Sequence, residues 1–144
     1  MGQSATIMID RPASDVFAFV MDVPNDARWR TGVVEAGFTS EGRVGPGSTG
    51  FDRIAANGRE MVATWTVFEY EPGLLARWTL DSGPIQGTGG YVCEQSGEGT
   101  RFTLEAQVRP VGWLRVLGPF FGMIARRQNN ADVRRLKGIL ETQA

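Results

Sequence analysis

The stretch that decides the fold class is REMVATWTVFEYEPGLLARWTLDSG, residues 59–83. Apolar and polar residues alternate in both halves of this stretch, and Pro72-Gly73 separates the halves. A period of two is typical of a half-buried strand, and a Pro-Gly pair between two such runs is typical of a turn. We therefore predict two antiparallel strands, Arg59–Glu71 and Leu74–Asp81, with Trp65 and Trp78 on their shared inner face.

Further strands with short turns lie on both sides of this pair. They are predicted at Ser4–Asp10, Val33–Thr39, Thr49–Ala55, Ile85–Gln95 and Thr100–Arg109. Turn signals such as Asn57-Gly58 leave no room for a crossover helix between neighbouring strands. From Val33 onward the sequence therefore predicts an antiparallel meander rather than βαβ units.

Helices are predicted before and after the meander. Pro12 begins a helix that ends at Asp22, and a very short second helix runs from Pro24 to about Trp29. The final segment, about Gly112–Thr142, has apolar residues three and four positions apart, with a kink expected at Gly118-Pro119. This order of elements predicts an α+β fold, in which one long helix lies across a sheet too wide for it to fill.

Length and charge limit the classes of partner. The 144 residues predict a single domain over residues 1–144. The net charge of −1 argues against a nucleic-acid partner, and the absence of a long apolar run argues against integral membrane contact. The N-terminal residues lack the pattern of a signal peptide, and a single cysteine, Cys93, excludes an intrachain disulfide. We therefore expect a cytoplasmic protein.

The chain contains no histidine, which excludes every catalytic or metal site that needs an imidazole group. Ser-His-Asp and Cys-His nucleophiles and zinc sites with histidine ligands are excluded, and we predict neither a metal nor another cofactor. Acid–base catalysis would need carboxylates, tyrosine, lysine, arginine-assisted water or Cys93. Between pH 6 and 8 we expect the affinity for a neutral apolar ligand to be nearly constant, unless a carboxylate has a strongly raised pKa.

Six short motifs, in order, resemble one known superfamily. They are Arg11–Phe17, Asp22-Val23-Pro24 through Trp29, Val44-Gly45-Pro46-Gly47-Ser48, Val67–Pro72, Gly99-Thr100-Arg101, and Arg135-Leu136-Lys137 with Glu141. Together they resemble the START-like helix-grip superfamily, also called SRPBCC, which includes polyketide cyclase/dehydrase-like proteins and pollen-allergen-like ligand carriers. The resemblance covers nearly the whole chain, and most of its motifs are turns, caps and core positions.

The resemblance implies a seven-stranded curved antiparallel sheet wrapped around the C-terminal helix, with two short helices after the first strand. It also implies a hydrophobic cavity between sheet and helix that takes lipids, polyketides, sterols or other apolar molecules. Some members catalyse cyclisation or dehydration, but the superfamily shares no universal catalytic residue. No catalytic residue is therefore assigned to this chain, and its lack of histidine departs from members that use one.

Strand alternation predicts which residues face this cavity. In the last strand Phe102 and Leu104 face inward, and in the strand before it Tyr91 does so. Arg53 would be the main polar group if it also points inward, since a guanidinium can bind a carboxylate or phenolate. The full predicted set is Trp29, Phe51, Arg53, Trp65, Trp78, Tyr91, Phe102, Leu104, Phe121 and Ile124.

Three functions fit these observations. The first is binding of a small hydrophobic ligand by a monomer or homodimer, which requires an apolar pocket with few polar groups. The second is a polyketide cyclase, aromatase or dehydratase, which requires converging polar groups, with Arg53, Tyr91 and Asp52 or Glu60 as candidates. The third is a co-chaperone-like interaction module, which would have a filled cavity and an exposed apolar patch.

Overall fold

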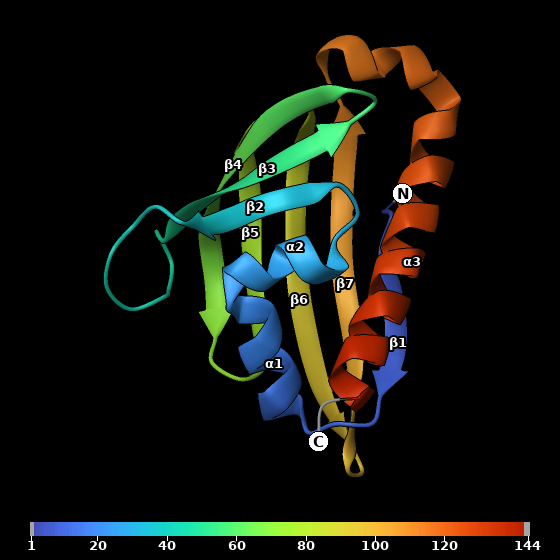
Figure 1. Ribbon diagram of the computed structural model, residues 1–144. Coiled ribbons are helices and arrows are strands. Elements are labelled where there is room, and N and C mark those ends of the chain that lie inside the picture. The colour runs from blue at the N-terminus through green and yellow to red at the C-terminus, as the bar shows by residue number, and fades with distance from the viewer. Residues whose placement is uncertain (1, 143–144) are drawn as a thin grey trace.

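The computed structural model describes residues 2–142, and its seven strands form one curled antiparallel sheet (Figure 1). The strands are β1 (Ala5–Ile9), β2 (Val33–Phe38), β3 (Thr49–Ala56), β4 (Arg59–Glu71), β5 (Leu75–Ser82), β6 (Ile85–Ser96) and β7 (Gly99–Pro110). Their order across the sheet is β1-β7-β6-β5-β4-β3-β2. Each strand from β2 to β6 pairs with the next one along the chain, while β1 pairs with β7. The meander predicted from the turn signals is confirmed.

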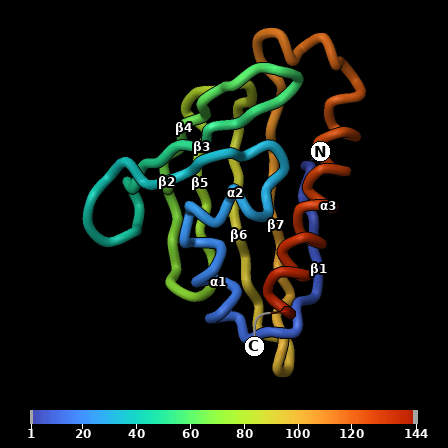
Figure 2. The backbone as a smooth tube through the Cα atoms, viewed as in Figure 1, coloured from blue at the N-terminus to red at the C-terminus, as the bar shows by residue number. Residues whose placement is uncertain are grey.

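The helices lie on the concave face of the sheet. They are α1 (Ala13–Met21), the 3-10 turn η1 (Val23–Asn25), α2 (Asp26–Trp29), the 3-10 segment η2 (Gly112–Phe120) and α3 (Phe121–Thr142). Figure 2 shows α3 running alongside β1 and β7, with α1 and α2 in front of the middle strands. The expected kink lies at Gly118, whose φ of 51° breaks the helical backbone just before Pro119. None of the helices within residues 2–142 is long and apolar enough to cross a membrane.

Strand register agrees with the alternation in β7 and departs from it in β3, β4 and β5. In β7, Phe102 and Leu104 are buried as predicted. The pairing of β4 with β5 shifts in register between Val67 and Glu69, so the long strand contains an irregularity near its end. The strand was predicted to begin at Leu74, but Leu74 is 40% exposed and Leu75 is 8% exposed. Leu74 belongs to the turn after Glu71, because its amide donates a hydrogen bond to the Glu71 carbonyl. Strand β5 therefore begins one residue later, at Leu75.

The core lies mainly at one end of the sheet. Buried side chains of α1, α2 and the C-terminal half of α3 pack there against β1, β6 and β7, and Trp29 is fully buried among them. A smaller cluster joins Val23 and Ala36 to Trp65 and Val67. At the other end no residue of η2 is buried, and the Arg59 guanidinium lies 5.2 Å from the Trp113 ring centroid. The helical layer is therefore tightly packed at the α1 end and loosely packed at the η2 end.

Candidate functional site

A cavity of about 440 Å³ lies between the inner face of the sheet and the segment formed by η2 and the start of α3. Most of the predicted cavity residues line it, namely Trp65, Trp78, Tyr91, Leu104, Phe121 and Ile124. Trp29 and Phe102 do not line it. They are fully buried behind it, with ring centroids 5.7 Å and 5.8 Å from that of Tyr91.

The prediction for β3 is wrong by one residue. Asp52 lines the cavity, while Phe51 and Arg53 lie on the other face of the sheet, where Arg53 forms ion pairs with Glu35 and Glu60. The cause is strand pairing: Asp52 lies opposite Ala63, and Ala63 faces inward. Glu60, a candidate for acid–base chemistry, is likewise on the outer face with Arg53.

Aromatic rings form one wall of the cavity. The ring centroids of Trp65 and Trp78 are 6.4 Å apart, and those of Trp78 and Tyr91 are 4.7 Å apart in an edge-to-face arrangement. A Cβ atom at Gly89 would lie 2.7–2.9 Å from the Trp78 indole, so the indole rests directly on the β6 backbone. Small residues on the sheet therefore leave room for the aromatic rings and for the cavity in front of the rings.

Four polar side chains converge on the cavity near α2, and we call Asp26, Arg30, Asp52 and Tyr91 the polar cluster. Asp26 is 5% exposed, and its polar neighbours in the cluster are Asp52, Arg30 and the Tyr91 hydroxyl. The Trp65 Nε1–H donates to Asp52 Oδ1 at 2.9 Å. Within residues 2–142, Asp26 Oδ1 has no hydrogen-bond partner.

These surroundings shift the titration of the polar cluster. Burial raises the pKa of Asp26 well above its usual value, and the charge of Asp52 raises it further, although Arg30 opposes this. Burial also raises the pKa of Tyr91, so its phenol stays neutral. Burial would lower the pKa of Arg30, but the neighbouring carboxyl groups of Asp26, Asp132 and Asp52 together raise it. The cluster therefore contains a permanent cation and a carboxyl group that favours its neutral form.

Arg30 is held in place from outside the cavity. Its Nε lies 3.3 Å from Asp132 Oδ2 on α3. Asp132 also accepts hydrogen bonds from the Thr31 amide at 3.1 Å and from Arg135 at 3.1 Å. The Arg30 guanidinium further lies 5.2 Å from the Trp29 ring centroid. Its positive charge is therefore already engaged by a buried carboxylate.

The lone cysteine is not part of this site. Cys93 is buried in the core, and burial raises the pKa of its thiol to about 12. The thiolate form is therefore suppressed at neutral pH, and Cys93 acts as a small apolar side chain. Within residues 2–142, no group of three or more Cys, Asp and Glu side chains is arranged to hold a metal ion.

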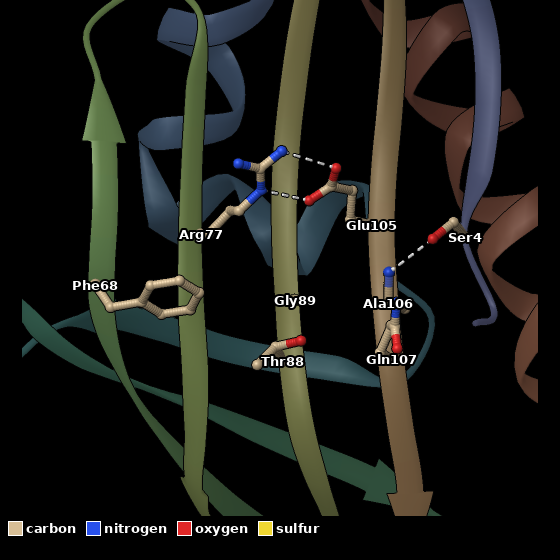
Figure 3. Close-up of a pocket in the computed structure, with 8 residues that line it drawn as sticks. All are labelled: Ser4, Phe68, Arg77, Thr88, Gly89, Glu105, Ala106 and Gln107. Carbon is tan, nitrogen blue, oxygen red and sulfur yellow. Dashed lines mark hydrogen bonds and ion pairs between the residues drawn. The ribbon is translucent and has the colours of Figure 1, made fainter. Parts of the chain in front are cut away.

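A second, polar depression lies on the outer face of β5, β6 and β7 (Figure 3). Arg77 crosses β6 there and donates to both carboxylate oxygens of Glu105, at 2.7 Å and 3.1 Å. It also donates to Glu69 at 2.9 Å, and these bonds raise its pKa. The guanidinium is paired with two carboxylates, so Arg77 offers no unpaired positive charge to a ligand.

The raised pKa of Asp26 predicts that stability falls as pH rises. The folded protein keeps a proton that the unfolded chain releases above the ordinary carboxyl pKa, so each pH unit above that value costs up to about 1.4 kcal/mol. We expect the free energy of unfolding in urea to be lower at pH 7.5 than at pH 5. Asp26→Asn should flatten this slope, since an amide keeps the shape and binds no proton. An unchanged slope in the variant would contradict the assignment.

Asp26 and Arg30 were not identified from the sequence. Both lie in the DARWR stretch, residues 26–30, which reads as an ordinary charged helix surface. Their burial follows only from the way α2 lies against the sheet and α3. Asp26 is nevertheless the kind of carboxylate with a raised pKa that the absence of histidine left as an open possibility.

Comparisons with known proteins agree with this architecture. The model of the family described as polyketide cyclase / dehydrase and lipid transport matches residues 3–144, and no curated protein sequence matches the chain.

A solved protein from Thermus thermophilus has a TM-score of 0.81 at 16% identity, with 100% of both chains covered. A START superfamily protein from Mycobacterium smegmatis has a TM-score of 0.76 at 16% identity, covering 98% of this chain and 97% of that one. The Zhui aromatase/cyclase from a Streptomyces species has a TM-score of 0.71 at 18% identity, covering 98% and 93%. At these identities the likeness concerns the fold.

Proposed function

The chain belongs to the polyketide cyclase/dehydrase and lipid transport family, and from that premise we propose that its cavity binds a small hydrophobic molecule. The observation that carries this proposal is the cavity of about 440 Å³ with its aromatic wall. A ligand that buries on the order of 300 Å² of apolar surface gains roughly 7 kcal/mol. Association costs offset part of this gain, so micromolar affinity is expected.

We propose that the ligand lies between Trp65 and Trp78 on the sheet and Phe121 and Ile124 on the helical side. All four side chains line the cavity. Trp29 and Phe102 support this surface from behind without touching the ligand, because they are fully buried in the core. The proposed site thus keeps most of the residues expected from strand alternation and adds the polar cluster.

Filling the cavity should abolish binding. Ala125 lines it from α3, and Ala125→Phe places a ring in the ligand's space. We expect at least a tenfold loss of affinity for prodan, a neutral fluorescent probe, followed by its emission shift. This loss corresponds to about 1.4 kcal/mol.

The matched control for this variant is Ala18→Phe, which adds the same ring to an exposed position on α1. It should leave the affinity for prodan within twofold of the wild type. Circular dichroism of both variants separates loss of binding from loss of folding. Unchanged prodan affinity in a folded Ala125→Phe variant would place the binding site elsewhere.

The polar cluster supports a second candidate function, a cyclase or dehydratase acting on a polyketide-like substrate. Such chemistry needs at least two converging polar groups, and Asp26, Asp52 and Tyr91 meet this requirement, whereas Arg53 and Glu60 do not reach the cavity. The test is incubation with a linear poly-β-ketone and mass spectrometry for loss of water. Activity that disappears in Asp26→Asn would support this candidate. A co-chaperone-like role is not favoured, because it requires a filled cavity.

We further propose that residues 1–144 act as one cytoplasmic domain, as a monomer or homodimer. Two observations support a single domain: β1 pairs with β7, and α3 packs on β1, so both ends of the chain belong to the same layers. The buried thiol of Cys93 fits a reducing compartment. Light scattering during size-exclusion chromatography measures the mass in solution.

A further inference from the structure

The charges of the polar cluster do not balance when all of its acids are ionised. Asp26 and Asp52 together carry two negative charges on the cavity wall, and Arg30 carries one positive charge. Arg30 is also shared with Asp132, which binds it from the opposite side. The cluster therefore lacks one positive charge, which either a proton on Asp26 or a cationic group of a ligand would supply.

The polar cluster contains a buried carboxyl oxygen without a hydrogen-bond partner, and a donor would satisfy it. Asp26 is 5% exposed, and its Oδ1 accepts no hydrogen bond from the residues that the structure describes. Asp52 uses Oδ1 to accept from Trp65. When both groups are ionised, their oxygens accept hydrogen bonds and cannot donate them, so a ligand group that completes the ionised site carries N–H or O–H bonds.

The aromatic wall beside the cluster favours a cation among such donors. Trp65, Trp78 and Tyr91 line the same cavity as Asp26 and Asp52, and neighbouring ring centroids along the wall are at most 6.4 Å apart. Ring faces attract organic cations, most strongly where water is excluded. A protonated amine also has three donors for the oxygens that the cluster presents.

From this arrangement we propose that the cavity selects a lipophilic amine, whose ammonium group lies against the carboxyl groups of Asp26 and Asp52 while its apolar body lies against Trp65 and Trp78. The inference rests on the proposed function, since the apolar body occupies the same cavity. It adds the chemical class of the ligand, which the cavity volume and the family leave open.

Other polar groups fit the cluster less well. A carboxylate ligand such as a fatty acid would meet two acids, and the only cation of the cluster is engaged by Asp132. A neutral alcohol would leave the proton on the carboxyl pair and would gain no charge interaction. Amines, alcohols and acids with the same apolar chain should therefore bind with different affinities.

Amine binding should depend on pH, because a proton and the ammonium group compete for Asp26. Burial and Asp52 raise the pKa of Asp26, so the proton must leave when the ammonium arrives. The titratable and charged groups around Asp26 are Asp52 on β3, Tyr91 on β6, Arg30 after α2 and, through Arg30, Asp132 on α3. Because the proton and the amine compete, affinity for the amine should rise with pH between 5.5 and 7.5 and affinity for the alcohol should not.

The test is isothermal titration calorimetry with decylamine, decanol and decanoic acid on the full chain. We expect decylamine to bind at least tenfold more tightly than decanol, and decanoic acid to bind more weakly than decanol. Titrations in buffers of different ionisation heat should show that decylamine, and not decanol, releases protons. Asp26→Asn should lower the affinity for decylamine at least tenfold, change that for decanol less than threefold and abolish proton release.

Two further variants keep the test decisive. Asp52→Asn retains an oxygen for the Trp65 N–H and removes the second carboxylate, so it should reproduce the loss if Asp26→Asn does not fold. Asp81→Asn, at an exposed position on β5, is the matched control and should behave as the wild type. Equal affinities for decylamine and decanol, or a decylamine affinity that survives both cluster variants, would overturn the amine inference and leave the proposed function intact. Failure of all three compounds and of prodan to bind would overturn both.

Discussion

Trp29→Ala should lower the free energy of unfolding by about 3–5 kcal/mol, because it removes a fully buried aromatic ring from the core. The Trp29 ring packs edge-on against Phe102 at a centroid distance of 6.0 Å, and it lies tilted against Tyr91 at 5.7 Å. The Arg30 guanidinium covers it at 5.2 Å. The variant therefore leaves a void where α2 meets the sheet. Urea denaturation followed by circular dichroism measures the loss.

The matched control is Trp113→Ala in η2, where the indole is 38% exposed and contacts Arg59. We expect a loss below about 1 kcal/mol there, as for an exposed cation–π pair. Trp29→Phe should fall between the two, since it keeps a ring and removes an indole N–H that has no acceptor within residues 2–142. Similar losses for Trp29→Ala and Trp113→Ala would contradict the placement of Trp29 in the core.

Two glycine substitutions should have effects of opposite sign. Gly87 in β6 has a φ of 133°, and a Cβ atom there would lie 2.0 Å from the Gln107 carbonyl oxygen on β7. Backbone strain and steric overlap add, so Gly87→Ala should destabilise the fold by about 3 kcal/mol or more. Gly138 lies in α3 with no neighbouring atom within 4 Å of the position of a Cβ atom. Gly138→Ala should stabilise the protein by about 0.5–1 kcal/mol.

Thermal and urea unfolding of both variants under the same conditions measure these effects. Comparable stability of Gly87→Ala and the wild type would mean that the β6–β7 pairing differs at this point from the one described. A destabilised Gly138→Ala would mean that this face of α3 is covered in solution.

The sequence predicted the register well where hydrophobicity alternates clearly. In β7, Phe102 and Leu104 stand among Arg101, Thr103 and Glu105, so only one register buries the apolar side chains. β3 lacks this contrast: Phe51 and Ile54 fall on opposite faces, and the apolar criterion selected Phe51. The true inner face carries Asp52, which accepts a hydrogen bond from Trp65 and lines the cavity together with Asp26, and no local pattern encodes such partners.

The roles of small residues and charged residues were harder to predict. In β6, Gly87 is required by its backbone conformation and by the closeness of β7, and the local sequence encodes neither. Asp26 and Arg30 could not be predicted as site residues from the sequence, because their burial depends on β3, β6 and α3 together. Local sequence predicts which face of a strand is apolar, and it does not predict which polar groups tertiary packing brings together.

The pairing of β1 with β7 has a consequence for how the chain folds during synthesis. Every other strand finds its partner next to it along the chain, whereas Ala5 pairs with Leu104 and Ile9 with Thr100. At a translation rate of about 5–20 residues per second, β1 waits on the order of 5–20 s for β7 to leave the ribosome. During that time the meander from β2 to β6 can assemble through local contacts, and β1 presents an unpaired strand edge. The last step of folding is then the closure of β1 and α3 onto β7, so the most aggregation-prone state is a nearly complete nascent chain.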